Sequence, residues 1–369
     1  MIAIIIFIII LSVLVMIHEL GHFIMAKRAG IGVEEFGFGL PPRLWGKKVG
    51  ETIYSVNWLP FGGFVRLKGE DPTDKHKGDK NSFWVKSAGQ RAKVILAGVF
   101  MNFVLAVVIF YVAVVALGFK VNMPLIIDHD FKFVKESRQV LVTDVGADTP
   151  AQGSGIEAGD SILSVDGVLI ADLDQLQKIV RASQDKQLTL VLENSVTNNR
   201  RTVVAVPAYN EKLSAPALGV GLSELISLNF ETPAQKIFSG FIHSYNTMDY
   251  SLRVMAELVS YSVRERDISA VSEGVAGPVG IAAATGQAVA YGPIAVLQLA
   301  GLLSLNLAFL NVLPIPALDG GRFFFLVVEV ITRRRTHPVL EKWVHTIGFA
   351  VLIGLVLLIT YNDILKLVR

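Results

Sequence analysis

The chain has 369 residues, of which 52% are hydrophobic and 18% are charged, and its net charge is +2 at pH 7. Its mean hydropathy of +0.52 exceeds what soluble domains need and indicates a membrane protein. The small net charge gives no reason to expect nucleic-acid binding, and the absence of cysteine excludes disulfides, thiolate nucleophiles and cysteine-ligated metal sites.

Residues 1–26 form an almost unbroken run of Ile, Leu and Val that surrounds the stretch MIHELGHFIM. The run is long enough to cross ~30 Å of hydrocarbon at ~1.5 Å per residue. A cleaved signal peptide would begin with positive charge, but Lys27 and Arg28 come after the apolar run. We therefore expect a first transmembrane helix here.

Three further apolar runs, at residues 94–119, 294–320 and 344–361, predict a total of four spans. Lys and Arg are dense in residues 27–93 and in the connection before the last span. The positive-inside rule places both of these connections in the cytoplasm. The long segment between the second and third spans then lies outside, with both chain ends.

Residues 127–222 contain short β-branched runs punctuated by Gly and Asp, with one helical stretch, which predicts a small α+β domain. In residues 231–266, apolar side chains recur at helical spacing among charges, which predicts an amphipathic helix or helix pair. The loop at 27–93 alternates like strands around a Pro-Phe-Gly-Gly turn. It is either a membrane-associated sheet or an ordinary soluble pair of hairpins.

The first span carries three ionisable residues that are expensive at membrane depth, roughly 2.5 to 3.5 kcal/mol for a charged side chain. On a helix, His18 and His22 project from one face with Glu19 beside them, which is the HExxH arrangement of zinc hydrolases. Neutral imidazoles suit Zn²⁺, but catalytic zinc normally takes three protein ligands. A third ligand must therefore come from elsewhere in the chain.

Asp319, in the stretch NVLPIPALDGG, is our candidate for the third ligand. An Asp-Gly pair alone is more often a turn. However, the first and third spans run in the same direction, so the cytoplasmic ends of both bring His18, His22 and Asp319 into one leaflet. Pro314 and Pro316 break the helix before Asp319, and irregular backbone at this depth requires surrounding protein or a water-filled cavity.

Two other polar groups in the spans have simpler explanations. Asn102, in the stretch AGVFMN, and Asn306 are expected to do no more than hydrogen-bond between helices. Asn311 has more weight, because it opens the segment that carries Asp319.

Taken in order, HELGH in the first span, the soluble domain with TPAQGSGIEAGDSILSVDG, then GPVGI and NVLPIPALDGG resemble a bacterial site-2 protease. This family consists of intramembrane zinc metalloproteases, here of the regulator-of-sigma-E-protease type. The resemblance covers nearly the whole chain. HExxH alone is moderately specific, whereas its combination with Asn-x-x-Pro-x-Pro-x-Leu-Asp-Gly is highly specific.

The resemblance implies a polytopic α-helical membrane protein with a membrane-associated β-hairpin region and one extracytoplasmic PDZ-like domain. Glu19 is then the general base, and Zn²⁺ binds His18, His22 and Asp319. The further residues that the resemblance assigns to substrate binding are Asn311, Pro314 and Pro316 near the metal, and Gly155 and Asp160 in the PDZ-like domain. The hairpin region at residues 32–68 would pair with an extended substrate strand.

The implied function is hydrolysis of peptide bonds within or near the membrane span of single-span proteins, such as anti-sigma factors or signal-peptide remnants. The implied location is the bacterial cytoplasmic membrane, with the active site toward the cytoplasmic leaflet and no nucleic-acid partner. Two alternatives belong to other classes: an inactive membrane scaffold that uses its PDZ-like domain, which predicts no stoichiometric zinc, and a transporter. Transporters usually show internal repeats, which are not found here.

Overall fold

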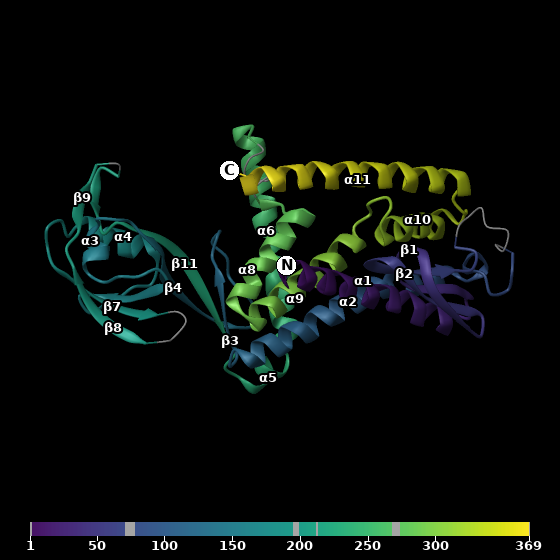
Figure 1. Ribbon diagram of the computed structural model, residues 1–369, viewed down its shortest axis with the longest axis horizontal. Helices are drawn as coiled ribbons and strands as arrows, with labels where there is room; N and C mark the ends of the chain where they lie inside the picture. The colour runs from purple at the N-terminus through teal and green to yellow at the C-terminus, as the bar shows by residue number, and fades with distance from the viewer. Residues whose placement is uncertain (1, 71–77, 195–198, 212, 268–273, 369) are drawn as a thin grey trace. The chain divides into compact units, whose positions relative to one another are not determined.

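The computed structural model describes the chain except for residues 1, 71–77, 195–198, 212, 268–273 and 369. Part of the predicted cytoplasmic loop, residues 71–77, therefore lies outside the described residues. The chain divides into two compact units, Met1–Ala113 with His243–Arg369, and Val114–Ile242. The first is mainly helical and the second is rich in strands (Figure 1).

Four helices of the described chain are long and apolar enough to cross a membrane, as the sequence predicted: Ile2–Arg28 (α1), Ala88–Ala116 (α2), Pro293–Val312 (α9) and Val339–Lys366, within α11 (Pro338–Val368). Their exposed side chains are apolar, for example Ile4, Phe100 and Leu357. Helices satisfy their own backbone hydrogen bonds, which is what hydrocarbon requires of a spanning segment.

The first unit also contains Pro278–Tyr291 (α8), Asp319–Thr332 (α10), the 3₁₀ helix Phe83–Val85 (η1) and most of the 27-residue helix Ser239–Glu265 (α6). The Gly- and Ala-rich stretch at residues 278–291 forms α8, which is only 14 residues long. Asp363 of α11 is buried and accepts a hydrogen bond from the backbone N–H of Gly280, in the first turn of α8. This contact joins α8 to α11.

The small sheet consists of two long strands, Val33–Val49 (β1) and Thr52–Leu67 (β2), each of which bends and pairs more than once. Residues 35–38 pair with 53–56 on one side, residues 33–38 pair with 63–67 on the other, and 43–49 pair with 52–57. The result is a sheet of four segments in which residues 63–67 form an edge.

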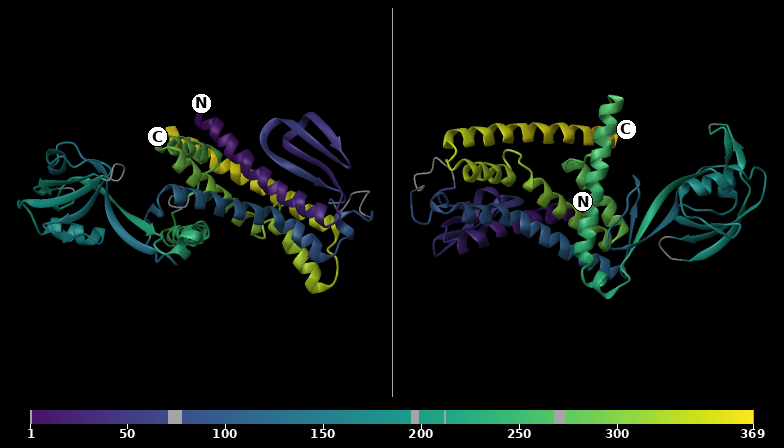
Figure 2. Two further views of the ribbon diagram at one scale, coloured as in Figure 1. Left: turned by 90° about the horizontal axis from the view of Figure 1, so that it is seen from below. Right: turned by 180° about the vertical axis from the view of Figure 1, so that it is seen from behind.

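This sheet lies along α1 (Figure 2). The hydroxyl of Ser12 donates to the carbonyl of Pro60 at 3.0 Å. The turn after Pro60 comes so close to the helix that a Cβ added at Gly63 would lie 2.5 Å from the sulfur of Met16. Glycine in this turn therefore allows the edge segment to approach the helix that carries HExxH.

The second unit is built on one sheet in the order β3-β11-β4-β5-β7-β8, with β6 paired to β5. Its strands are Lys120–Pro124 (β3), Lys135–Val145 (β4), Asp160–Val165 (β5), Val168–Leu169 (β6), Leu188–Asn194 (β7), Arg200–Ala205 (β8) and Val220–Asn229 (β11). Ala208–Asn210 (β9) and Ala215–Ala217 (β10) form a separate pair. The helices are Pro150–Gly153 (α3), Leu173–Arg181 (α4) and Pro233–Ile237 (α5).

The core of this unit lies between the sheet and α4, with Val140, Leu190 and Leu176 almost fully buried. Its sheet extends beyond the predicted domain bounds of 127–222, because β3 and the end of β11 belong to it. The backbone N–H of Phe230 donates to the carbonyl of Phe119 at 3.0 Å. The two ends of the unit are therefore neighbours in space.

Candidate metal centre

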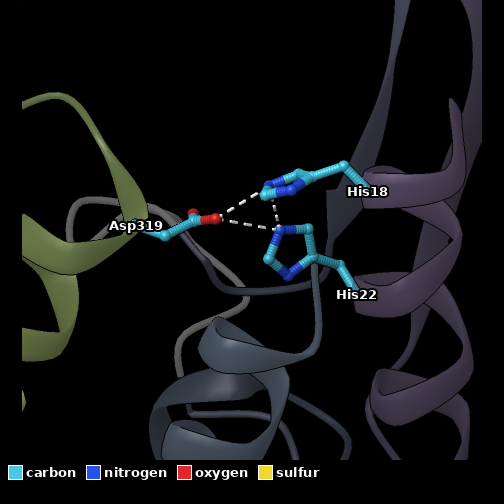
Figure 3. Close-up of side chains that lie close together, drawn as sticks. All are labelled: His18, His22 and Asp319. Carbon is cyan, nitrogen blue, oxygen red and sulfur yellow. Dashed lines mark hydrogen bonds and ion pairs between the residues drawn. The ribbon is translucent and has the colours of Figure 1, made fainter. Parts of the chain in front are cut away.

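Two imidazoles project from neighbouring turns of α1 toward a carboxylate at the start of α10 (Figure 3). The Nε2 atoms of His18 and His22 lie 2.9 and 3.2 Å from Oδ2 of Asp319, and 3.1 Å from each other. Among the described residues, these three form the group that offers ligand atoms close enough for one metal ion. All three come from the sequence prediction.

The spacing of these atoms fits zinc. In a tetrahedral site with bonds of 2.0 to 2.1 Å, neighbouring ligand atoms lie about 3.3 to 3.4 Å apart. The observed separations of 2.9 to 3.2 Å need only a small expansion to reach that value. Two nitrogens and one carboxylate oxygen are also a donor set that catalytic zinc uses, with the fourth position open to water.

Asp319 is placed by a sharp break in the chain. Helix α9 ends at Val312, and α10 begins at Asp319. Pro314 and Pro316 cannot continue a helix, since proline lacks the backbone N–H that the helix requires. A Cβ added at Gly321 would lie 2.5 Å from the carbonyl oxygen of Ile315, so the loop packs directly on the first turn of α10.

The loop between α9 and α10 also contacts a third helix, α11. The backbone N–H of Ala317 donates to Nδ1 of His345 in α11 at 2.9 Å. A Cβ added at Gly348 would collide with Pro316. These contacts fix the start of α10, and with it the direction of the Asp319 side chain.

Helix α2 presents one face to both histidines. The carbonyl of Val94 lies 2.8 Å from Nδ1 of His22, and the amide of Asn102 lies 3.4 Å from Nδ1 of His18. Between them, a Cβ added at Gly98 would lie 2.5 Å from Nε2 of His22 and 2.7 Å from Nε2 of His18. Glycine at this position therefore makes room for the imidazoles.

Glu19 is held by the sheet. Its Oε2 accepts a hydrogen bond of 3.0 Å from the backbone N–H of Val65, in the edge segment 63–67. Glu19, both histidines and Asp319 line one cavity of about 160 Å³. The carboxylate therefore faces the same small space as the three candidate ligands.

A larger cavity of about 740 Å³ adjoins the first and shares part of its lining, including Phe64 and Arg322. It is lined by charged side chains of α10 and α11, among them Glu329 and Lys342. Arg322 pairs with Glu70, just after β2, where the two cavities share their lining. The Glu70 carboxylate raises the pKa of the Arg322 guanidinium.

The remaining predicted site residues lie elsewhere. Asn311 is half-buried in the last turn of α9, and neither it nor Pro314 or Pro316 lines the cavity of the candidate ligands. Gly155 and Asp160 belong to the second unit. Asp160 is fully buried, accepts from the backbone N–H of Glu157 and pairs with Arg201 at 2.5 Å.

Sequence reasoning did not single out Gly98, Val65, Glu70 or Arg322. Their contacts with the site come from three different segments, and nothing in their local pattern marks them. From the stretch AGVFMN, only Asn102 was considered, as a group that hydrogen-bonds between helices. The spacing in this stretch, with Gly98 four residues before Asn102, is the signal that would have indicated a helix face turned toward the histidines.

The donor set, the neighbouring carboxylate and four candidate membrane helices together define a metal-dependent hydrolase of the membrane. The model for peptidase family M50 matches residues 6–355 of the chain. The chain belongs to this family, and it is a zinc metalloprotease.

Similar proteins align with this chain over nearly their whole lengths. A protein of Clostridium perfringens, named as a candidate zinc metalloprotease, is 35% identical over 96% of both chains. Zinc metalloprotease RasP of Geobacillus kaustophilus is 27% identical and covers 99% of this chain and 98% of its own. The regulator of sigma-W protease RasP of Bacillus subtilis is 28% identical over 98% of both.

One solved structure, a PDZ domain of an SdrC-like protein from Listeria monocytogenes, matches 22% of this chain and 85% of its own length. The two are 19% identical, with a TM-score of 0.21.

Proposed function

We propose that this protease cuts peptide bonds within or next to the membrane span of single-span membrane proteins, with Zn²⁺ held by His18, His22 and Asp319. The observation that carries the proposal is the convergence of these three side chains beside Glu19. Glu19 and both histidines lie on α1, a helix apolar enough to cross a membrane. Ionisable groups in such a helix are costly, and they occur mainly where a function requires them.

When bound, zinc supplies Lewis acidity, which activates water and polarises a carbonyl group. Glu19 takes the proton from the attacking water and later returns it to the leaving amine. The hydrogen bond from Val65 holds the Glu19 carboxylate toward the cavity for this task.

Water must reach a site at membrane depth. The small cavity shares its lining with the larger one, whose walls carry Glu329, Glu341 and Lys342. Charged walls favour water over lipid. We therefore assign the larger cavity to water supply and to the departure of products.

A helical substrate must expose a peptide bond, and its freed backbone groups then need partners. Residues 63–67 form an edge of the small sheet, and Val65 of this edge contacts Glu19. Strand addition to that edge would place a substrate backbone beside the catalytic carboxylate. Asn311, Pro314 and Pro316 would act on the substrate outside the cavity, from the end of α9 and the loop that follows.

The second unit is proposed to be a PDZ-like domain on the outer side of a bacterial cytoplasmic membrane, with Gly155 and Asp160 near a ligand-binding turn. The positive-inside rule carries this orientation, and it puts the active site toward the cytoplasmic leaflet. One relative is named a regulator of sigma-W protease. By analogy, anti-sigma factors or signal-peptide remnants are the substrates that we propose.

The orientation can be tested directly, because the chain has no cysteine. Single exposed cysteines, Arg334→Cys after α10 and Lys186→Cys in the second unit, are labelled in intact cells with a membrane-impermeant reagent. We expect labelling at position 186 and none at position 334 until the cells are opened. The opposite pattern would reverse the proposed topology.

The catalytic assignment is tested with Glu19→Gln. The amide cannot take the proton of water, yet both imidazoles remain, so we expect full zinc content with no cleavage of single-span membrane proteins by purified enzyme in liposomes. Cleavage near the unmodified rate would remove Glu19 from the role of base. Protein without stoichiometric zinc in either form would favour the scaffold alternative.

A further inference from the structure

His18 has a second neighbour that the catalytic proposal does not use. Its Nε2 faces Asp319 and His22, while its Nδ1 faces the side chain of Asn102 on α2. Asn102 is completely buried, and its Oδ1 has no hydrogen-bond partner among the described residues. Its backbone carbonyl is fixed by the hydroxyl of Ser304 on α9 at 2.8 Å.

The two ring nitrogens of a neutral histidine have opposite roles. If Nε2 binds a metal, it carries no proton, and Nδ1 then carries the proton and must donate it. The amide NH₂ of Asn102 faces Nδ1 of His18 at 3.4 Å, so two donors would then face each other. The amide oxygen and nitrogen exchange places by a rotation of the side chain, and their assignment follows from the hydrogen-bond network.

His22 shows the relationship that the rotated amide would give His18. Its Nδ1 lies 2.8 Å from the carbonyl of Val94, an atom that only accepts. Val94, Gly98 and Asn102 follow one another at four-residue spacing on one face of α2, opposite the histidines on α1. On this face, Val94 thus provides a carbonyl acceptor, Gly98 leaves room for the imidazoles and Asn102 provides a second polar group.

We propose that Asn102 is a positioning residue whose amide oxygen accepts the Nδ1–H of His18. This hydrogen bond selects the tautomer in which Nε2 is free for zinc and fixes the plane of the ring. The orphaned Oδ1 then has a partner. The inference rests on the proposed metal site, and it adds to that site a determinant of zinc affinity that touches neither metal nor substrate.

The test compares two substitutions of Asn102 in the purified full-length protein, with zinc alone as the probe. Asn102→Leu is similar in size but cannot accept a hydrogen bond, whereas Asn102→Asp can only accept one. Loss of a partner to a metal-binding histidine typically costs 10 to 100-fold in affinity. We expect the dissociation constant for zinc, measured by chelator competition, to rise by that factor in Asn102→Leu and to stay near the unmodified value in Asn102→Asp.

The control is Thr285→Val, at a fully buried polar residue whose hydroxyl donates to the carbonyl of Ile281 in its own helix. It should not change zinc affinity, even if it lowers thermal stability. Equal weakening in Asn102→Leu and Asn102→Asp would overturn the acceptor role, and so would unchanged affinity in Asn102→Leu. If Asn102→Leu does not fold, weak binding by Asn102→Asp alone overturns it.

The two proposals fail in different ways. If the unmodified protein binds no zinc, the metal site is wrong and the role of Asn102 is wrong with it. If the unmodified protein binds zinc but Asn102→Leu binds it equally well, the site stands and only the role of Asn102 is wrong.

Discussion

Oδ2 of Asp319 lies 2.9 Å from Nε2 of His18, although 301 residues separate the two along the chain. The contact joins the start of α10 to the second half of α1. It completes a donor set that neither segment has alone.

Replacement of Asp319 by asparagine distinguishes a ligand from a turn residue. Asparagine supports the same turn geometry but carries no charge. We expect zinc affinity to fall by at least 10-fold, because changes to groups that merely support metal ligands already cost 10 to 100-fold. Proteolysis should be lost with it. Both are measured on membrane-inserted protein, by metal analysis after dialysis and by a cleavage assay.

Asp363→Asn is the matched control for that experiment, since Asp363 is also a buried carboxylate but bonds to Gly280 away from the metal site. This variant should keep its zinc. Full zinc occupancy and normal cleavage in Asp319→Asn would show that the third ligand lies elsewhere.

Gly98→Ala tests the gap in the face of α2. The added Cβ would lie within 2.7 Å of both imidazoles, so a ring or the helix must move. We expect weaker zinc binding and lower cleavage in a protein that still folds. Gly89→Ala, in the same helix, meets no atom within 4 Å and should leave zinc binding unchanged. Similar zinc affinity in the two variants would mean that the histidines tolerate the shift.

The pair formed by Arg322 and Glu70 links α10 to the chain after β2 at the wall that the two cavities share. We expect Arg322→Glu and Glu70→Arg each to slow cleavage, because two like charges would then repel each other and push α10 away from the chain after β2. The double variant should recover part of the rate. Exposed pairs contribute only about 0.2 to 1 kcal/mol, so the coupling will be modest. A double variant slower than both single variants would contradict this.

The second unit should be separable from zinc binding. Phe119 and Phe230 are hydrogen-bonded neighbours, so a short linker can join them after Lys120–Asn229 is removed. None of the three proposed zinc ligands lies in the removed segment. We expect the excised protein to keep its zinc while the ratio of its cleavage rates on two different substrates changes. Zinc loss in a membrane-inserted form would show that the unit supports the metal site.

Features that depend on near neighbours in the chain could be predicted from the sequence. Apolar runs predicted four spans, because spanning length and hydropathy are local properties. The four-residue spacing of His18 and His22 predicted a shared helix face, because the α-helical repeat fixes that geometry. Pro314 and Pro316 predicted the break before Asp319, because proline cannot continue a helix.

Contacts between distant segments depend on packing of the whole chain. Span direction predicted that Asp319 and His18 share a leaflet, but not that their ligand atoms lie 2.9 Å apart. The face of α2 with Gly98 and Asn102 and the hydrogen bond from Val65 to Glu19 had no counterpart in the sequence prediction. Residues 35–38 pair on both sides, which strand periodicity cannot predict, since alternation gives the faces of a strand but not its partners. Such contacts arise from packing of the whole chain, and local pattern does not contain them.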